Sequence, residues 1–435
     1  MTPFAIAFFI LNSGALLLFP RNWAPLPLIA GACYMTLAQG VEVGPFSFTF
    51  IRMLLLAGFI RIIIRGERPA GGMCSLDWLM IAFALLALSS SFFRPDITEA
   101  LIWRLGLVFN TLGVYFLIRI FCQSLEDVRQ LVRITAILLS PVAIAMIYEQ
   151  LFLHNLFSYL GGVPSTPGFR EGGIRSQGPF RHAILAGTVG AVCLPLMAGL
   201  WKTHRKAAIV GIVSCVTIVF CSNSSGPLVS ALAGIGGLIM WHQRHKMRVV
   251  RWVAVIGYIA LDLLMKAPAY YLMGRIPLVP GSTGWHRAEL INSAIRHLNE
   301  WWLWGTDYTR HWMPTGVSWS PDHTDITNHY IKMGVVGGLP LMILFIITLA
   351  KGFSYVGKTL QRTQHLAPHS AFLVWSLGAS LFANAATMIS VSYFDQSFLF
   401  LYLTLAAVGS TYCAKLDGLF KDQTGENTLM PSRDG

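Results

Sequence analysis

Three arginines and a histidine lie close together in one Gly- and Pro-rich segment, residues 161–182. They are Arg170, Arg175, Arg181 and His182. A guanidinium group binds phosphate through two parallel hydrogen bonds and stays charged at any working pH. The segment therefore predicts an anion site, and a lipid-linked diphosphate is one ligand that fits it. Pairing with phospholipid headgroups or with the neighbouring glutamate is the alternative for the same arginines.

A carboxylate and a histidine stand four residues apart just before an apolar stretch, as Asp325 and His329. If a helix began at Asp325 the two would lie one turn apart, and a carboxylate beside a histidine orients the ring and raises its basicity. The pair predicts a general base, and Asn328 next to it is expected to contact the substrate. His323 is the rival for the catalytic role.

Residues 284–302 show the periodicity of an amphipathic helix. The predicted apolar face comprises Ala288, Ile291, Ala294, Ile295, Leu298 and Trp301. The predicted polar face comprises Glu289, Ser293, Arg296 and Glu300. Arg287 projects from the apolar face, where a charge must be paired or must face a polar cavity. We therefore expect Arg287 in the substrate site, with a structural ion pair as the alternative.

Aromatic residues are dense after this helix and include Trp301, Trp302 and Trp304. Aromatic faces stack on sugar rings, so Trp304 is expected to contact a glycan; an interfacial aromatic belt is the alternative. The seven cysteines form neither a CxxC pair nor a Cys/His metal spacing. Neither a metal site nor a cofactor is expected.

The elements that must position these residues are membrane-spanning helices. The chain is 54% hydrophobic and only 12% charged, whereas a soluble domain carries about 25% charged residues. Apolar blocks long enough to cross a bilayer are expected at about 4–20, 23–40, 46–64, 76–93, 100–120, 130–151, 182–200, 207–221, 226–241, 249–265, 331–350, 370–391 and 396–414. These blocks predict thirteen spans, or twelve if one of the weaker blocks does not cross.

The net charge of +12 does not indicate nucleic-acid binding. Its basic residues cluster in alternate gaps between apolar blocks, as the positive-inside rule requires, so they predict contact with membrane lipids. The loops 152–181 and 266–330 then lie together on the outer face. Long connections of this kind are uncommon and are often functional, and Gly and Pro are expected to keep the first loop out of regular structure.

The predicted fold is all-α, a polytopic transmembrane bundle with amphipathic helices in the large outer loop. Residues 1–265 hold the first ten spans and the loop 152–181, residues 266–330 form the large outer loop, and residues 331–414 hold the last spans. Residues 415–435 form a cytoplasmic tail that is expected to be disordered after Asp417.

In this order the motifs resemble the O-antigen ligase and Wzy-type polymerase superfamily of bacterial envelope proteins. The resemblance covers the topology of most of the chain and the motifs of its second half. Its pieces are Arg175-Ser176-Gln177-Gly178-Pro179-Phe180-Arg181-His182 opening a span, Arg287 heading a helix that runs to Trp304-Gly305, and Thr327-Asn328-His329-Tyr330 followed by Gly334, Gly337 and Gly338.

The resemblance implies a metal-independent, inverting glycosyltransferase of the bacterial inner membrane, with its active site facing the periplasm. The donor would be a glycan on undecaprenyl diphosphate, and the acceptor either lipid A–core or another glycan repeat unit. Flippase and chain-length regulator proteins would be its partners. In the family, arginines hold the diphosphate and a loop histidine assists transfer; Arg287 and His329 are the nearest matches here.

The chain departs from the family pattern in two places. Where members often carry Ser-Arg-Gly, it reads Ser224-Ser225-Gly226, so Arg175 or Arg181 would replace the missing arginine. The order Asn328-His329, where many ligases have His-Asn, keeps His323 open as the catalytic histidine. Both departures favour a polymerase over a ligase. The alternative function is a transporter or flippase, which would place its polar groups near mid-membrane and show internal symmetry.

Overall fold

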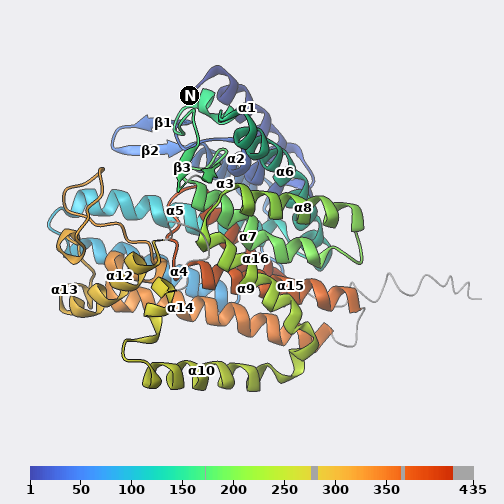
Figure 1. The fold of residues 1–435 in the computed structure, drawn as a ribbon. Coiled ribbons are helices and arrows are strands. Elements are labelled where there is room, and N and C mark those ends of the chain that lie inside the picture. Colours follow the sequence, from blue (N-terminus) through green and yellow to red (C-terminus); the bar gives the residue numbers. More distant parts are fainter. Residues whose placement is uncertain (172, 276–282, 364–367, 415–435) are drawn as a thin grey trace, which may run out of the picture.

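The computed structural model describes residues 1–171, 173–275, 283–363 and 368–414, and it is mostly helical (Figure 1). Each predicted apolar block contains a helix. These helices are α1 (Pro3–Leu18), α2 (Pro25–Tyr34), α3 (Phe50–Arg65), α4 (Ser75–Ser89), α5 (Ile97–Phe121), α6 (Leu125–Phe152), α7 (Ala183–Gly199), α8 (Arg205–Cys221), α9 (Ser225–Ile239), α10 (Met247–Leu264), α14 (His329–Thr363), α15 (Pro368–Thr387) and α16 (Phe398–Cys413). The predicted disorder after Asp417 lies outside the described residues.

Shorter elements fill the connections. The 3-10 turns are η1 (Arg21–Trp23), η2 (Ser90–Phe93), η3 (Leu156–Leu160), η4 (Met240–Lys246), η5 (Ala269–Tyr271) and η6 (Arg310–Trp312), and the short helices are α11 (Leu272–Arg275), α12 (Gly284–Arg296) and α13 (Leu298–Trp301). Two antiparallel hairpins pair β1 (Gly40–Val43) with β2 (Phe46–Thr49) and β3 (Gly168–Arg170) with β4 (Gly173–Arg175). The prediction of an irregular first loop was therefore wrong in part, and residues 46–49 form a strand instead of a helix.

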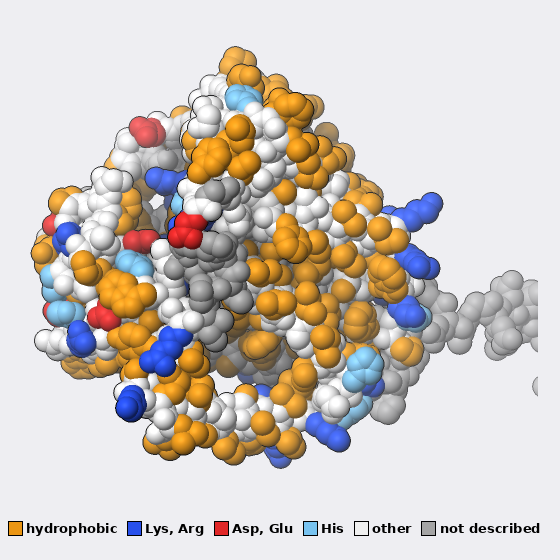
Figure 2. Space-filling view, in the orientation of Figure 1, with side chains coloured by type: hydrophobic (Ala, Val, Ile, Leu, Met, Phe, Trp, Pro, Cys, Tyr) orange, Lys and Arg blue, Asp and Glu red, His pale blue; other side chains and the backbone are white. Residues whose placement is uncertain are grey.

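Five of the described helical segments are long and apolar enough to cross a membrane: Ser75–Phe93, Ile97–Phe121, Leu125–Phe152, His329–Thr363 and Pro368–Thr387. Three shorter apolar helices, α1, α7 and α16, accompany them. In Figure 2 hydrophobic side chains cover the middle of the visible face, whereas the acidic groups lie toward the side of α12 and α13. This composition is that of a membrane protein.

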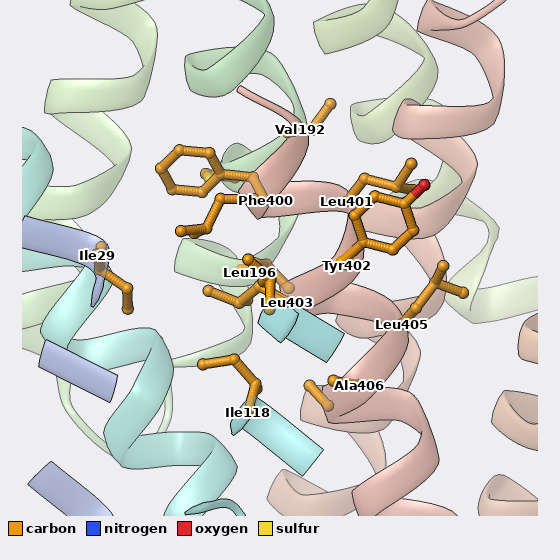
Figure 3. Packing of buried hydrophobic residues seen from close by; sticks show 14 of the residues in the cluster. Ile29, Ile118, Val192, Leu196, Phe400, Leu401, Tyr402, Leu403, Leu405 and Ala406 are labelled. Atoms are coloured by element: carbon orange, nitrogen blue, oxygen red, sulfur yellow. The ribbon is translucent and has the colours of Figure 1, made fainter. Parts of the chain in front are cut away.

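The centre of the fold is built from α7 and α16, whose side chains interdigitate in Figure 3. Leu196 of α7 and Leu403 of α16 are both buried there, and Ile118 of α5 packs beside them. Gly190 of α7 lies so close to α8 that a Cβ would come within 2.7 Å of the Cys215 carbonyl oxygen. The missing side chain of Gly190 thus allows α7 and α8 to pack closely.

Helix α14 is broken after its second turn, at Gly337 and Gly338, which have non-helical backbone angles. The break frees the Val335 and Val336 carbonyls. Arg94 donates to them at 2.8 and 3.0 Å, and Arg104 donates to Val336 at 2.8 Å.

Helix α12 confirms that residues 284–296 are helical, but its buried face differs from the predicted one. Ser293, predicted on the polar face, is buried, whereas Ile295 and Leu298 are exposed. Arg287 is buried as predicted, with only 9% of its surface exposed.

Candidate functional site

The segment that follows β4 is held by two separate parts of the fold. The Gln177 and Gly178 backbone N–H groups donate to the Glu149 carboxylate of α6 at 2.9–3.2 Å. The Gln396 side-chain amide donates to the Pro179 carbonyl at 2.9 Å, from the turn before α16. A Gly- and Pro-rich stretch without helix or strand is thereby fixed, and with it the arginines at its two ends.

Arg175 and Arg287 are brought to one place from segments more than a hundred residues apart. Both are buried, with 9% of each residue exposed. Arg175 donates through Nη2 to the Ser224 hydroxyl at 2.8 Å, at the turn between α8 and α9. The Nε atoms of Arg175 and Arg287 are buried and have no hydrogen-bond partner in the described part of the chain.

Like charges surround both groups. Burial, with the charges of Arg170 and Arg287, lowers the pKa of Arg175 to about 10. Burial and Arg170 also lower the pKa of Arg287, against the opposing effect of Asp325. We call Arg170, Arg175 and Arg287 the arginine cluster. The charge of Arg170 acts on both of the other two members.

His182 and Asp325 complete the surroundings of the cluster. Desolvation and the charges of Arg175 and Arg170 lower the pKa of His182, whereas Asp325 opposes this shift. The His182 side chain is at the surface. One exposed carboxylate does not balance three arginines. Buried guanidinium groups without an internal partner are costly, and a bound anion would remove that cost.

The predicted hydrogen bond between Asp325 and His329 is not formed. Helix α14 begins at His329, so Asp325 lies in the preceding loop rather than one helical turn away. The His329 Nδ1 accepts the Tyr393 backbone N–H at 3.3 Å, and the ring packs edge-on against Phe345. Because Nδ1 accepts, the neutral ring carries its proton on Nε2, an arrangement that suits a hydrogen-bond donor better than a base.

Lys332 is a charged residue near both His329 and Asp325, and it was not among the residues predicted from the sequence. It lies near enough to Asp325 and to His329 for their charges to interact. Its Nζ donates to the Tyr393 carbonyl at 3.1 Å. The signal that could have found it is a lysine one turn into an apolar helix, because charge in such a helix often marks a functional site.

Two of the predicted site residues make structural contacts instead. The Asn328 side chain caps α14: its Oδ1 accepts the Ile331 N–H at 3.1 Å, and its Nδ2 donates to the Ile389 carbonyl at 3.0 Å. Trp304 stacks on Phe93 with ring centroids 3.9 Å apart. Phe93 therefore covers one indole face, which is not open to a sugar.

Arg181 and His323 have other surroundings. Arg181 is exposed, and its backbone N–H donates to the buried Asp395 carboxylate at 3.1 Å. His323 forms a hydrogen bond with the Ser320 hydroxyl at 2.8 Å and lies against Trp319. Of the three predicted catalytic residues, Asp325 is thus the one whose charge acts on the arginine cluster.

Within the described ranges, one group of side chains could hold a metal ion: His297, Glu300 and His311. It lies at the opposite end of α12 from Arg287. No family model matches the chain, and no curated protein matches it either.

Proposed function

We propose that this protein is a membrane glycosyltransferase that transfers or polymerises an oligosaccharide linked to undecaprenyl diphosphate. The observation that carries the proposal is the convergence of Arg175 and Arg287, both buried and both with an unpartnered Nε. Two guanidinium groups with Arg170 beside them offer the forked donors and the positive charge that a diphosphate requires.

The departure at Ser224-Ser225-Gly226 supports the same assignment. Arg175 donates to the Ser224 hydroxyl, so its guanidinium lies at the turn where members of the superfamily that the chain resembles often carry an arginine. Arg175 of β4 would then bind the diphosphate in place of the missing arginine. Arg181 could have replaced it, but its side chain is exposed.

The chemistry needs leaving-group stabilisation and a proton acceptor. The acceptor hydroxyl oxygen attacks the anomeric carbon from the face opposite the diphosphate, and the bond from that carbon to the phosphate oxygen breaks. The arginine cluster stabilises the departing diphosphate. Asp325 is in reach of the cluster's charge and takes the hydroxyl proton.

We also propose that the thirteen helices at the predicted apolar blocks cross, or partly cross, the bacterial inner membrane as a bundle of twelve or thirteen spans. The loop 266–330 and the hairpin β3–β4 would then face the periplasm. Five of these helices meet the length and composition of a span, and the others pack among them except α10, which has no buried residue. Flippase and chain-length regulator proteins would supply the donor and limit the product.

The test is transfer by the full chain in liposomes that contain a polyprenyl-diphosphate-linked repeat unit, without nucleotide. Arg287→Ala should lower the transfer rate about 100- to 1,000-fold, because it removes a donor to developing charge. Arg296→Ala is the matched control: it lies on the same helix, its side chain is 67% exposed, and it stands 3.7 Å from Glu289. The control should retain transfer.

Adding either free repeat units or lipid A–core as acceptor separates polymerase from ligase. Equal activity of Arg287→Ala, Arg175→Ala and the wild type would refute the assigned site. Movement of solute across the liposome membrane, with no new glycosidic bond, would instead establish the transporter alternative.

A further inference from the structure

Two histidines and a glutamate meet at the end of α12 that is remote from Arg287. His297 follows the last residue of α12, Glu300 lies in α13, and His311 lies in η6. The Glu300 carboxylate is 2.7 Å from His297 Nδ1 and 3.0 Å from His311 Nε2. One ligand atom from each residue lies within 4.8 Å of the other two.

The rings are held in place by their neighbours. Trp312 stacks parallel to the His297 ring, and Tyr308 stacks on the His311 ring with centroids 4.9 Å apart. The Trp312 indole N–H donates to Glu300 Oε2 at 3.0 Å. Outer contacts of this kind fix the direction of metal ligands and are a regular part of metal sites.

We infer that His297, Glu300 and His311 bind a divalent transition-metal ion, with Zn²⁺ the best fit. Two imidazole nitrogens and a carboxylate oxygen are a zinc donor set, whereas Mg²⁺ and Ca²⁺ take oxygen ligands. Tetrahedral bonds of about 2.0–2.1 Å put ligand atoms about 3.3 Å apart. The three residues therefore need little movement to close on an ion, and water would complete the coordination.

The metal would have a structural role, because it would hold two segments of the chain together. His297 belongs to the helix that carries Arg287, whereas His311 belongs to the segment that leads to Asp325. The ten residues from Arg287 to His297 span about 15 Å along a helix axis, so the ion lies away from the arginine cluster. The inference does not depend on the glycosyltransferase assignment, and the transfer chemistry needs no metal.

Binding can be measured with the full chain, free of a histidine tag, purified in detergent and stripped with a chelator. Co²⁺ should give the absorption bands of a tetrahedral site, and Zn²⁺ should bind in a one-to-one ratio by calorimetry. His311→Ala should weaken Zn²⁺ binding at least about 100-fold, because it removes one of three protein ligands. Glu300→Gln keeps the side-chain volume and should also weaken binding, which covers the case in which His311→Ala folds poorly.

His242→Ala is the control, an exposed histidine of η4 outside the cluster, and it should bind Zn²⁺ as the wild type does. Zn²⁺ should also slow tryptic cleavage after Arg310 in the wild type but not in His311→Ala. Absence of stoichiometric binding in the wild type would overturn the inference and leave Glu300 as a hydrogen-bond bridge between two histidines. Equal affinity in the wild type and Glu300→Gln would overturn it as well.

Discussion

At the scale of single residues, the molecule is notable for positive charge that it does not neutralise internally. Arg61 and Arg119 are also buried, but each has an acidic partner, Glu67 and Asp77. Arg175 and Arg287 have no ion pair among the described residues. The ion pairs that were the alternative for these arginines are therefore not formed there. Unpaired charge of this kind reduces stability and is retained where a ligand supplies the counter-charge.

The pKa of His182 depends on the positive charge of the arginine cluster. Its pKa is lowered by desolvation and by Arg175 and Arg170, so its neutral form persists to a lower pH than in an unfolded chain. The folded state therefore loses stability as the pH falls below about 6.5, because the unfolded chain binds the proton first. Removal of the Arg175 charge should raise the pKa of His182.

We expect Arg175→Met to shift the pH midpoint of His182 modification by diethyl pyrocarbonate upward, since this reagent attacks the neutral ring. Mass spectrometry of the peptide that contains His182 gives the midpoint. Arg296→Met, on the exposed side of α12, should leave it unchanged. An unchanged midpoint in Arg175→Met would mean that the arginine cluster does not act on His182.

At the scale of elements, the break in α14 is where this helix is hydrogen-bonded to the residues that follow α13. The Leu339 N–H donates to the Trp302 carbonyl at 2.7 Å, and the Thr306 N–H donates to Val335 at 3.0 Å. The end of α13 is thus hydrogen-bonded to the helix that begins at His329. Arginines at the freed carbonyls also suit the negative end of the first half-helix.

Gly338→Ala should destabilise the protein by at least about 1–3 kcal/mol, because φ +76° and ψ −178° form a region that only glycine adopts easily. A Cβ there would also collide with the Leu303 backbone. Thermal unfolding in detergent measures the loss.

Gly357→Ala, in the same helix, is the control, since its Cβ would meet nothing within 4 Å. Alanine favours a helix over glycine by about 0.5–1 kcal/mol, so this variant should be neutral or stabilised. Equal unfolding temperatures for the two variants would show that the break does not require glycine.

At the scale of the whole molecule, charge and hydrophobicity are separated. Lys202 and His245 are exposed in basic connections between helices, whereas Glu171 and Asn299 are exposed near the arginine cluster and the histidine pair. Figure 2 shows basic groups toward both edges of the face, acidic groups toward the edge of α12 and α13, and hydrophobic side chains between the edges. This separation is expected if a lipid bilayer surrounds the hydrophobic middle of the molecule.

Single cysteines test this orientation in a chain whose seven native cysteines are replaced. In spheroplasts a membrane-impermeant maleimide should label Glu171→Cys and Asn299→Cys. It should label Lys202→Cys and His245→Cys only after permeabilisation. The reverse pattern would exclude a periplasmic site.

The sequence by itself determined where the helices lie and that Arg287 is misplaced on an apolar face. Helix position and amphipathicity depend on neighbours within a few residues, and these are visible in the sequence. Tertiary structure decided that Arg175 joins Arg287 and Ser224, that Asp325 does not pair with His329, and that two histidines meet at Glu300. These contacts depend on which distant segments pack together, and the local periodicity of the sequence does not show this. The same holds for the positive φ of Gly338, because the break is accompanied by backbone hydrogen bonds from Leu339 to Trp302 and from Thr306 to Val335, which join segments distant in the sequence.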